Sequence, residues 1–331
     1  MRHGLPACGN AAPADAGPTG RRRPPGQLQL DLVSAAGAAG PGARRPLPGP
    51  ARRPGRHRRI DRIMRDPRRE RALAEIAAQA AANYAGELGA GGGERIEVFL
   101  QVLSGARAPD AVAANRQLHR RMYMPGLSAR PYWEAGRFPV AELLQRRYPL
   151  LRAEAERLLV TAGVFGTRPG EAHWGDSRID RGRLNGAWNA WYLQRYFKRQ
   201  SLAAVHTPVA LRSLDGCQVS REALFSVVGP GTAITLHSDE LNFVTTLYLP
   251  LVSTPGATIT FDRSTRELRA GACFAADTTF LHESFNESGE WRVILIVDVW
   301  HPELTPLEVR FLSDIMPLAD AVMRGVRPAA C

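Results

Sequence analysis

The chain has 331 residues, 44% of them hydrophobic, and a formal net charge of +11. This length is enough for one large domain or two smaller ones with a real hydrophobic core. The charge does not indicate a nucleic-acid-binding body, because its excess lies in residues 1–71 and the remaining residues carry 27 basic and 27 acidic side chains.

Residues 1–63 form a leader rich in Arg, Pro, Gly and Ala, which we expect to lack structure because its apolar residues are sparse. A dispensable tail, or upstream sequence before a start at Met64, is the main interpretation, and a basic arm for an anionic partner is the alternative. The three arginines 21–23 do not indicate an export signal, because prolines and Asp31 interrupt the apolar run that follows them.

Scattered cysteines and short apolar runs favour a cytoplasmic protein. The four cysteines show no short pair spacing, so they indicate neither a disulfide framework nor a zinc site. No run approaches the roughly 18 apolar residues of a membrane span. We therefore expect neither a membrane nor a nucleic acid as a partner.

The segment 64–142 is predicted to be mainly helical, because apolar side chains recur at steps of three and four residues. Glycine and proline clusters at 91–93 and 125–126 separate the helices. This pattern leaves open whether the helices dock a substrate or brace the following domain. The predicted helices cover 66–88, 94–104, 109–123 and 139–160.

After about residue 185, short β-rich runs alternate with turn signals, which predicts an antiparallel sandwich or barrel without βαβ units. The last run, 292–300, is apolar at nearly every position, so we expect a central strand covered on both faces. The predicted strands are 224–228, 232–237, 243–251, 257–261, 272–276 and 292–300.

A candidate metal site follows the second of these strands. His237 and Asp239 are two residues apart, so in a strand their side chains share one face, and His282 lies 45 residues later. Two imidazoles and one carboxylate leave three octahedral positions open, which suits non-haem Fe(II). The pattern is weak alone, since a surface histidine beside an aspartate is common, and Asp239 facing away is the alternative.

Arg292 strengthens this interpretation, because it stands ten residues after His282 and opens the apolar strand. A buried cavity that binds a dicarboxylate needs a bidentate cation at its far end. We expect Arg292 to lie deeper in the barrel than His282. The alternative, a surface arginine at a strand end, is disfavoured by the apolar residues 293–297.

Several short motifs occur in order along residues 143–315, and the strongest is the run from Ile296 to Leu304. Together they resemble the aspartyl/asparaginyl β-hydroxylases. The resemblance implies a mainly β catalytic domain, the double-stranded β-helix or jelly roll of cupin-like proteins, followed by a tail at 316–331. The motifs are Phe225-Ser226, Pro230-Gly231-Thr232 ahead of His237, Phe280 to Glu283, and Met124 to Leu127 ahead of Trp133 and Phe138-Pro139.

The resemblance implies a dioxygenase that uses Fe(II) and 2-oxoglutarate to hydroxylate an unactivated carbon. His237 and His282 would bind iron, and Arg292 and Ser226 would hold the distal carboxylate of 2-oxoglutarate. Trp300 and His301 belong to the signature run and are expected to serve packing and hydrogen bonding. Tyr248 is a further cosubstrate candidate, and the substrate-pocket candidates are Trp188, Asn242 and Thr246.

Two departures from the family pattern bear on the substrate. Animal members have no carboxylate at the place of Asp239, so this chain would offer a full facial triad. Thr246 and Tyr248 stand where the family typically has an Arg and a His, so a substrate carboxylate would lose its usual partner. The β-carbon of an Asp or Asn residue in a peptide or protein is the expected target. The alternatives are a free amino acid or natural-product precursor, and a non-catalytic cupin-like metal-binding or sensing domain.

Overall fold

The computed structural model describes residues 66–89, 93–108, 122–160, 184–185, 188–239 and 241–325. The expected leader 1–63 and nearly all of the predicted helix 109–123 lie outside these residues. Every helix in the described part of the chain is too short or too polar to cross a lipid bilayer.

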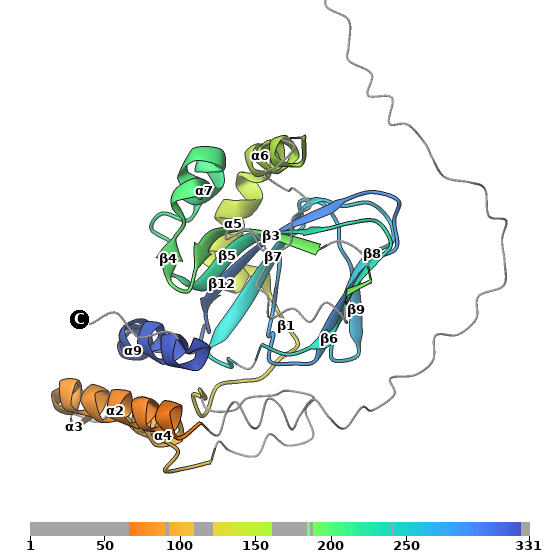
Figure 1. The fold of residues 1–331 in the computed structure, drawn as a ribbon. Coiled ribbons are helices and arrows are strands. Elements are labelled where there is room, and N and C mark those ends of the chain that lie inside the picture. Colours follow the sequence, from red (N-terminus) through yellow and green to blue (C-terminus); the bar gives the residue numbers. More distant parts are fainter. Residues whose placement is uncertain are drawn as a thin grey trace, which may run out of the picture. The chain divides into compact units, whose positions relative to one another are not determined.

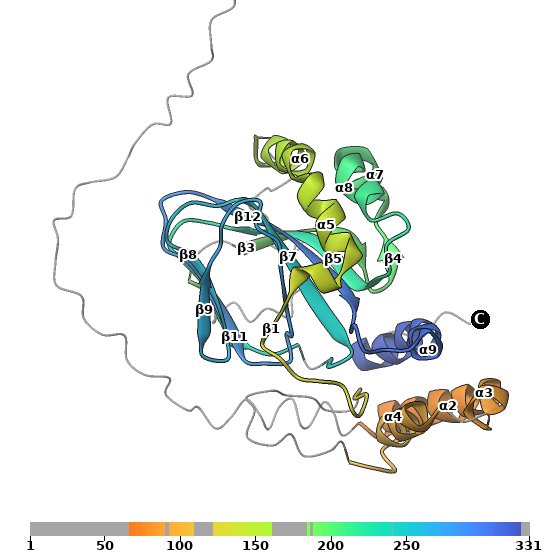
Figure 2. The same ribbon diagram turned by 180° about the vertical axis from the view of Figure 1, so that it is seen from behind.

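Two antiparallel sheets form the centre of the described part of the chain (Figures 1 and 2), and this arrangement is the double-stranded β-helix expected from the sequence. The larger sheet contains, in spatial order, β1 (Tyr132–Trp133), β10 (Phe274–Ala276), β7 (Val244–Val252), β12 (Arg292–Trp300), β5 (Val219–Val228), β3 (Trp188–Arg195) and β4 (Lys198–Arg199). The smaller sheet contains β2 (Leu184–Asn185), β6 (Thr232–His237), β11 (His282–Asn286), β8 (Ala257–Phe261) and β9 (Ser264–Glu267).

β12 is the central strand of the larger sheet, between β5 and β7, as its apolar sequence predicts. Its side chains alternate between the two faces. Val293, Leu295 and Val297 are buried in a cluster shared with the helices, whereas Ile294 and Ile296 face the smaller sheet. One face of this sheet is therefore core, and the other is free to build a site.

Four helices cover the outer face of the larger sheet (Figures 1 and 2), where their apolar side chains complete the main core. The sequence predicts one helix over 139–160, but the structure breaks it at Arg147. Pro149 causes this break, because proline has no N–H to donate and its ring clashes with the preceding turn. The four helices are α5 (Pro139–Arg146), α6 (Tyr148–Val160), α7 (Ser201–His206) and α8 (Pro208–Ser213).

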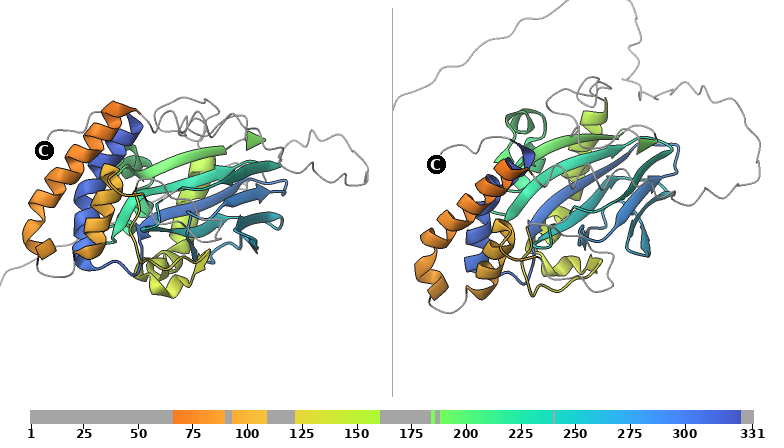
Figure 3. Two further views of the ribbon diagram at one scale, coloured as in Figure 1. Left: turned by 90° about the horizontal axis from the view of Figure 1, so that it is seen from below. Right: turned by 60° about the horizontal axis from the view of Figure 1, so that its bottom comes forward.

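A second helical layer packs at the side of the barrel, where α2 and α4, in orange, lie next to the blue α9 (Figure 3). The predicted helix 94–104 coincides with α4, and the predicted helix 66–88 divides at Tyr84. The helices are α2 (Pro67–Asn83), α3 (Ala85–Gly89), α4 (Glu94–Ser104) and α9 (Pro306–Arg324).

The C-terminal helix corrects one expectation, because residues 316–324 were expected to belong to a tail and instead form the second half of α9. A capping box between Thr305 and Glu308 starts the helix. Apolar side chains such as Met316 and Val322 then recur at helical spacing and are buried against α2 and α4. The helix therefore belongs to the folded unit.

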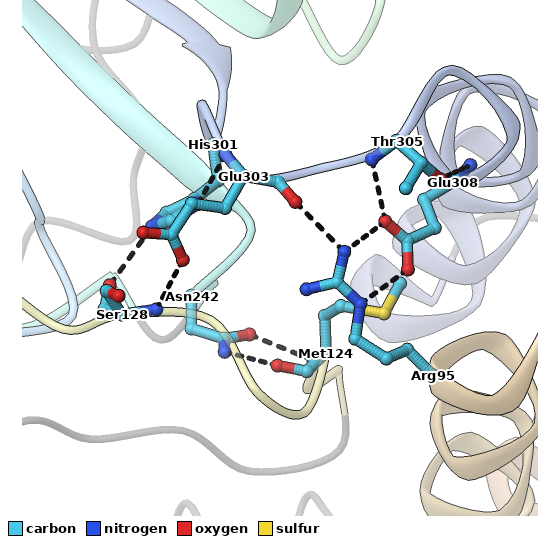
Figure 4. Close-up of polar contacts among 8 residues, drawn as sticks. All are labelled: Arg95, Met124, Ser128, Asn242, His301, Glu303, Thr305 and Glu308. Atoms are coloured by element: carbon cyan, nitrogen blue, oxygen red, sulfur yellow. Dashed lines mark hydrogen bonds and ion pairs between the residues drawn. The ribbon is translucent and has the colours of Figure 1, made fainter. Parts of the chain in front are cut away.

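Polar contacts join this second helical layer to the end of β12 (Figure 4). Arg95, on α4, donates from Nε to Glu308 at 2.6 Å and from Nη2 to the Glu303 carbonyl at 2.9 Å. His301 accepts from the Glu303 N–H at Nδ1, so its Nε2 carries the proton that reaches the Ser128 carbonyl at 3.1 Å. His301 is buried and Trp300 packs in the same helical cluster, as their expected structural roles require.

Arg95→Ala is expected to lower the free energy of unfolding by about 2 kcal/mol, because it leaves the Glu308 carboxylate buried without its cation. For a domain of this size that loss corresponds to a fall in Tm of about 4–8 °C, measurable by calorimetry. Arg146→Ala is the matched control, because its ion pair with Glu142 is exposed and contributes under about 1 kcal/mol. Equal losses in both variants would contradict this role of Arg95.

Candidate metal and cosubstrate site

Three potential metal ligands meet on the smaller sheet. β6 ends at His237 and β11 begins at His282, and these residues stand directly opposite each other in the β6–β11 pairing. Their ring centroids are 4.0 Å apart. Asp239 follows β6 by two residues, and one ligand atom from each of the three side chains lies within 4.8 Å of the others. These three side chains could therefore hold one metal ion.

His282 is held in a form that suits metal binding. Its Nδ1 lies 2.9 Å from the Phe280 carbonyl, so Nδ1 carries the proton and the Nε2 lone pair is available to a metal. The ring is buried and stacks on Phe261 with centroids 4.8 Å apart. Burial, with a contribution from His237, lowers the pKa of His282 to about 4, so the imidazole is neutral at neutral pH.

The Asp239 segment is fastened to the loop that leads into β11. The Asp239 N–H donates to the Thr278 carbonyl at 3.0 Å, and the Ser238 hydroxyl donates to the Thr279 carbonyl at 2.8 Å. Thr279 is itself fixed by its N–H bond to the Asp277 carboxylate at 3.0 Å. These bonds hold the two ligand-bearing segments together without help from an ion.

Arg292 is buried, with 2% of its surface exposed, so the alternative of a surface arginine is wrong. Its Nη1 donates to the Ser284 hydroxyl at 2.5 Å, while its buried Nε has no hydrogen-bond partner. No carboxylate among the described residues forms an ion pair with it. Burial lowers the pKa of Arg292 to about 10, which reflects a cation whose charge is not compensated within the protein.

Two further cosubstrate candidates lie beside this arginine. Ser226 stands opposite Ile294 on the neighbouring strand β5, and its hydroxyl oxygen accepts from Trp188 Nε1 at 3.0 Å. Tyr248 is buried on β7, and burial raises its pKa well above the usual value, so it keeps its proton as a donor. A cavity of about 540 Å³ connects Ser226, Tyr248, Trp188 and Arg292 with the three potential metal ligands.

The two remaining pocket candidates differ in their placement. Thr246 lines the cavity and donates to the Asp298 carboxylate at 2.9 Å. Asn242 does not line it, which corrects the expectation, because its amide is bonded to the backbone of Met124 at 2.7 and 3.0 Å (Figure 4). Asn242 therefore fixes the segment that enters the domain and does not contact a cavity ligand.

Sequence reasoning missed two polar residues of the cavity, although strand alternation contains the signal for both. Ser284 lies two residues after His282 on the same face of β11 and contacts Arg292. Asp298 lies six residues after Arg292 on the cavity face of β12. Both follow from assigning one buried face to each strand and reading every second residue.

The part of the chain that carries this site is similar to known proteins. Residues 145–302 match the family model described as aspartyl/asparaginyl beta-hydroxylase. The mouse aspartyl/asparaginyl beta-hydroxylase is 29% identical over 201 residues, which are 57% of this chain and 26% of that protein. The ornithine lipid ester-linked acyl 2-hydroxylase of Rhizobium tropici is 25% identical over 191 residues, 55% of this chain and 64% of that protein.

Solved structures give a more distant likeness. A Pseudomonas putida prolyl-4-hydroxylase has 14% sequence identity and a TM-score of 0.28, and the match covers 46% of this chain and 86% of that one. The chain spans about a quarter of the length of the mouse and human aspartyl/asparaginyl beta-hydroxylases that it matches.

Proposed function

Because residues 145–302 belong to the aspartyl/asparaginyl β-hydroxylase family, we propose that the chain is an Fe(II)- and 2-oxoglutarate-dependent dioxygenase. The observation that carries the proposal is the buried Arg292, whose Nε has no partner and which faces the same cavity as the two histidines and Asp239. A metal-binding or sensing domain without turnover needs no such buried cation, so this rival class leaves Arg292 unexplained.

His237, Asp239 and His282 would hold the ferrous ion. They supply two imidazoles and one carboxylate, and this set leaves positions open for a cosubstrate and dioxygen. A ferrous ion bound there would couple the oxidation of 2-oxoglutarate to succinate and carbon dioxide with the hydroxylation of a C–H bond by the second oxygen atom. The hydrogen bond from His282 to the Phe280 carbonyl orients the ring for this role.

Arg292 would hold the distal carboxylate of 2-oxoglutarate, because a guanidinium presents N–H donors in a fork that matches a carboxylate. Ser226 would add a further donor, since its oxygen already accepts from Trp188 and its own O–H remains to donate. Tyr248, kept protonated by burial, completes a group of neutral or cationic donors around a dianionic ligand.

Apolar side chains also line the cavity between its polar groups. Ile294 and Ile296 separate the polar positions of β12, and Ile259 and Leu224 line the same cavity. Such apolar neighbours lower the local polarity and so strengthen the pairing of a carboxylate with Arg292. The residues that line the cavity therefore bind and orient the cosubstrate and the substrate. The proposed reaction requires no proton transfer by a side chain.

The target carbon belongs, in the first proposal, to an Asp or Asn residue of a peptide or protein, and the mouse and human relatives are named aspartyl/asparaginyl beta-hydroxylase. A small molecule, such as a free amino acid or a natural-product precursor, is the second candidate. Thr246 favours it, because a hydroxyl bonded to Asp298 at this position offers no cation to a substrate carboxylate.

The proposed reaction predicts that purified protein supplied with Fe(II), 2-oxoglutarate and dioxygen releases succinate, slowly even without a substrate. Mass spectrometry of peptide and small-molecule pools treated in the same way would detect the gain of one oxygen atom in the substrate. Protein treated with a chelator is the control and is expected to release none. Equal succinate release with and without the metal would contradict the proposal.

A further inference from the structure

The cavity extends beyond the proposed cosubstrate region to a second polar end. On β12, residues 292, 294, 296 and 298 alternate onto the cavity face, so one strand runs along the whole cavity. Arg292 stands at one end of this row and Asp298 at the other, with Ile294 and Ile296 between them. Six residues of strand place the Cα atoms of Arg292 and Asp298 roughly 20 Å apart, at about 3.3 Å per residue.

The neighbouring strands repeat this change of character along the cavity. On β5, Ser226 lies opposite Ile294 and Leu224 lies opposite Ile296, and Glu222 follows at the Asp298 end. On β7, Thr246 lies directly opposite Asp298. The cavity wall therefore runs from a cation with hydroxyl donors, across apolar residues, to a group of carboxylates.

Asp298 points into the cavity and is incompletely satisfied. Its Oδ1 accepts from the Thr246 hydroxyl at 2.9 Å, and no described residue forms a hydrogen bond or ion pair with its Oδ2. Burial, reinforced by the nearby Glu222, raises the pKa of Asp298 to about 7. A carboxylate in such a place gains most from a positively charged partner.

The guanidiniums nearby are engaged with other carboxylates. Arg221 donates to Asp320 Oδ1 from Nε and Nη2 at 3.1 and 3.0 Å and approaches Glu222 at 3.4 Å. Arg324 donates to the other Asp320 oxygen at 2.8 Å. Of the charged side chains that line this end, three are acidic and Arg221 is the basic one. Arg221 acts on Asp298 from a distance and lowers its pKa, but no basic side chain among the described residues forms a hydrogen bond or ion pair with Asp298.

We propose that the Asp298 end of the cavity binds a positively charged group of the primary substrate, an ammonium or a guanidinium. The inference rests on the proposed function, which assigns the Arg292 end of the cavity to 2-oxoglutarate, and it adds the class of primary substrate. A diacid at Arg292 and a cationic substrate at Asp298 occupy complementary ends, so each charge selects its own ligand.

Binding of n-pentylammonium to the full-length protein, measured by calorimetry, tests the inference, with pentan-1-ol and hexanoate as neutral and anionic comparisons. The titration is made without metal, so that the amine cannot bind to iron, and again anaerobically with Fe(II) and 2-oxoglutarate. We expect the cation to bind about tenfold or more tightly than pentan-1-ol in both titrations, and than hexanoate in the one where 2-oxoglutarate occupies Arg292, because a charge-assisted hydrogen bond has that effect. A capped lysine peptide distinguishes a peptide source of the cation from a small amine.

Asp298→Asn is expected to remove about a tenfold preference for the cation. Thr246→Arg places a guanidinium opposite Asp298 and is expected to abolish the preference as well, which provides a second variant should the first fold poorly. Glu156→Gln removes an exposed charge on α6 and is the matched control with unchanged binding.

The three ligands binding equally, or the preference persisting in Asp298→Asn, would overturn the inference. If the preference is absent while iron-dependent succinate release is intact, only this inference fails. If the preference is present while no succinate forms, the proposed function fails and the cation site stands.

Discussion

Replacing Arg292 by methionine is expected to raise the 2-oxoglutarate concentration needed for half-maximal succinate release by about thirtyfold or more. The variant loses a charge-assisted pair with the distal carboxylate, which contributes about 2 kcal/mol or more, and each 1.4 kcal/mol is a factor of about ten. The titration of succinate release against 2-oxoglutarate measures this change directly.

The same variant is expected to keep or raise the Tm, which separates a ligand-binding arginine from a structural one. Burial lowers the pKa of Arg292 to about 10, so its charged form is less favourable in the folded protein than in water. Removing an uncompensated buried charge and leaving an apolar chain of similar length relieves that cost. Arg292→Lys, which keeps the charge and loses the fork, should give an intermediate cosubstrate requirement.

An unchanged dependence on 2-oxoglutarate in the methionine variant would show that the guanidinium does not bind the cosubstrate. A large fall in Tm would instead show that its contact with Ser284 stabilises the fold. The two readouts therefore move in different directions under the functional and the structural interpretation.

The sequence contains most of the fold, because strand signals are local. The runs 232–237, 257–261 and 292–300 coincide with β6, β8 and β12, where alternation or continuous apolarity is strong. β11 was not predicted, because its polar side chains obscure the alternation of buried and exposed positions. Its alternate residues are buried because it pairs with β6 on one side and β8 on the other. Pro149 indicates a break in the predicted helix 139–160, but the amphipathic pattern that continues past it suggested one unbroken helix.

The two-residue spacing of His237 and Asp239 predicted that their side chains lie together, and the structure brings one ligand atom of each within 4.8 Å of the other, although β6 ends at His237 and Asp239 follows it. The pairing of β6 with β11 then places His282 opposite His237, which the sequence spacing alone does not show. The expectation that Asn242 lines the pocket was wrong, because in a connecting loop no regular alternation of side chains predicts where a side chain points. Asp298 was overlooked because its neighbours in the run 296–304 suggested packing, although its place six residues after Arg292 on an alternating strand puts it on the cavity face.

The strongest effect on the metal is expected from His282→Ala, which should reduce the affinity for Fe(II) or Co(II) by more than about 100-fold. Changing a group that merely orients a ligand costs about 10–100-fold in affinity, so removing the ligand itself costs more. Anaerobic titration followed by the Co(II) absorption spectrum measures this without any turnover. Glu283→Ala is the matched control, since the next residue of β11 points away from the buried face.

Asp239→Ala then decides whether the carboxylate is part of the site. Its side chain is exposed, but one of its oxygens lies within 4.8 Å of a ligand nitrogen on both histidines, so we expect weaker metal binding and an altered Co(II) spectrum. An unchanged spectrum would reduce the site to two histidines. Metal binding that survives in His282→Ala would be more damaging, because it would place the ion elsewhere and leave the buried Arg292 without a cosubstrate to orient.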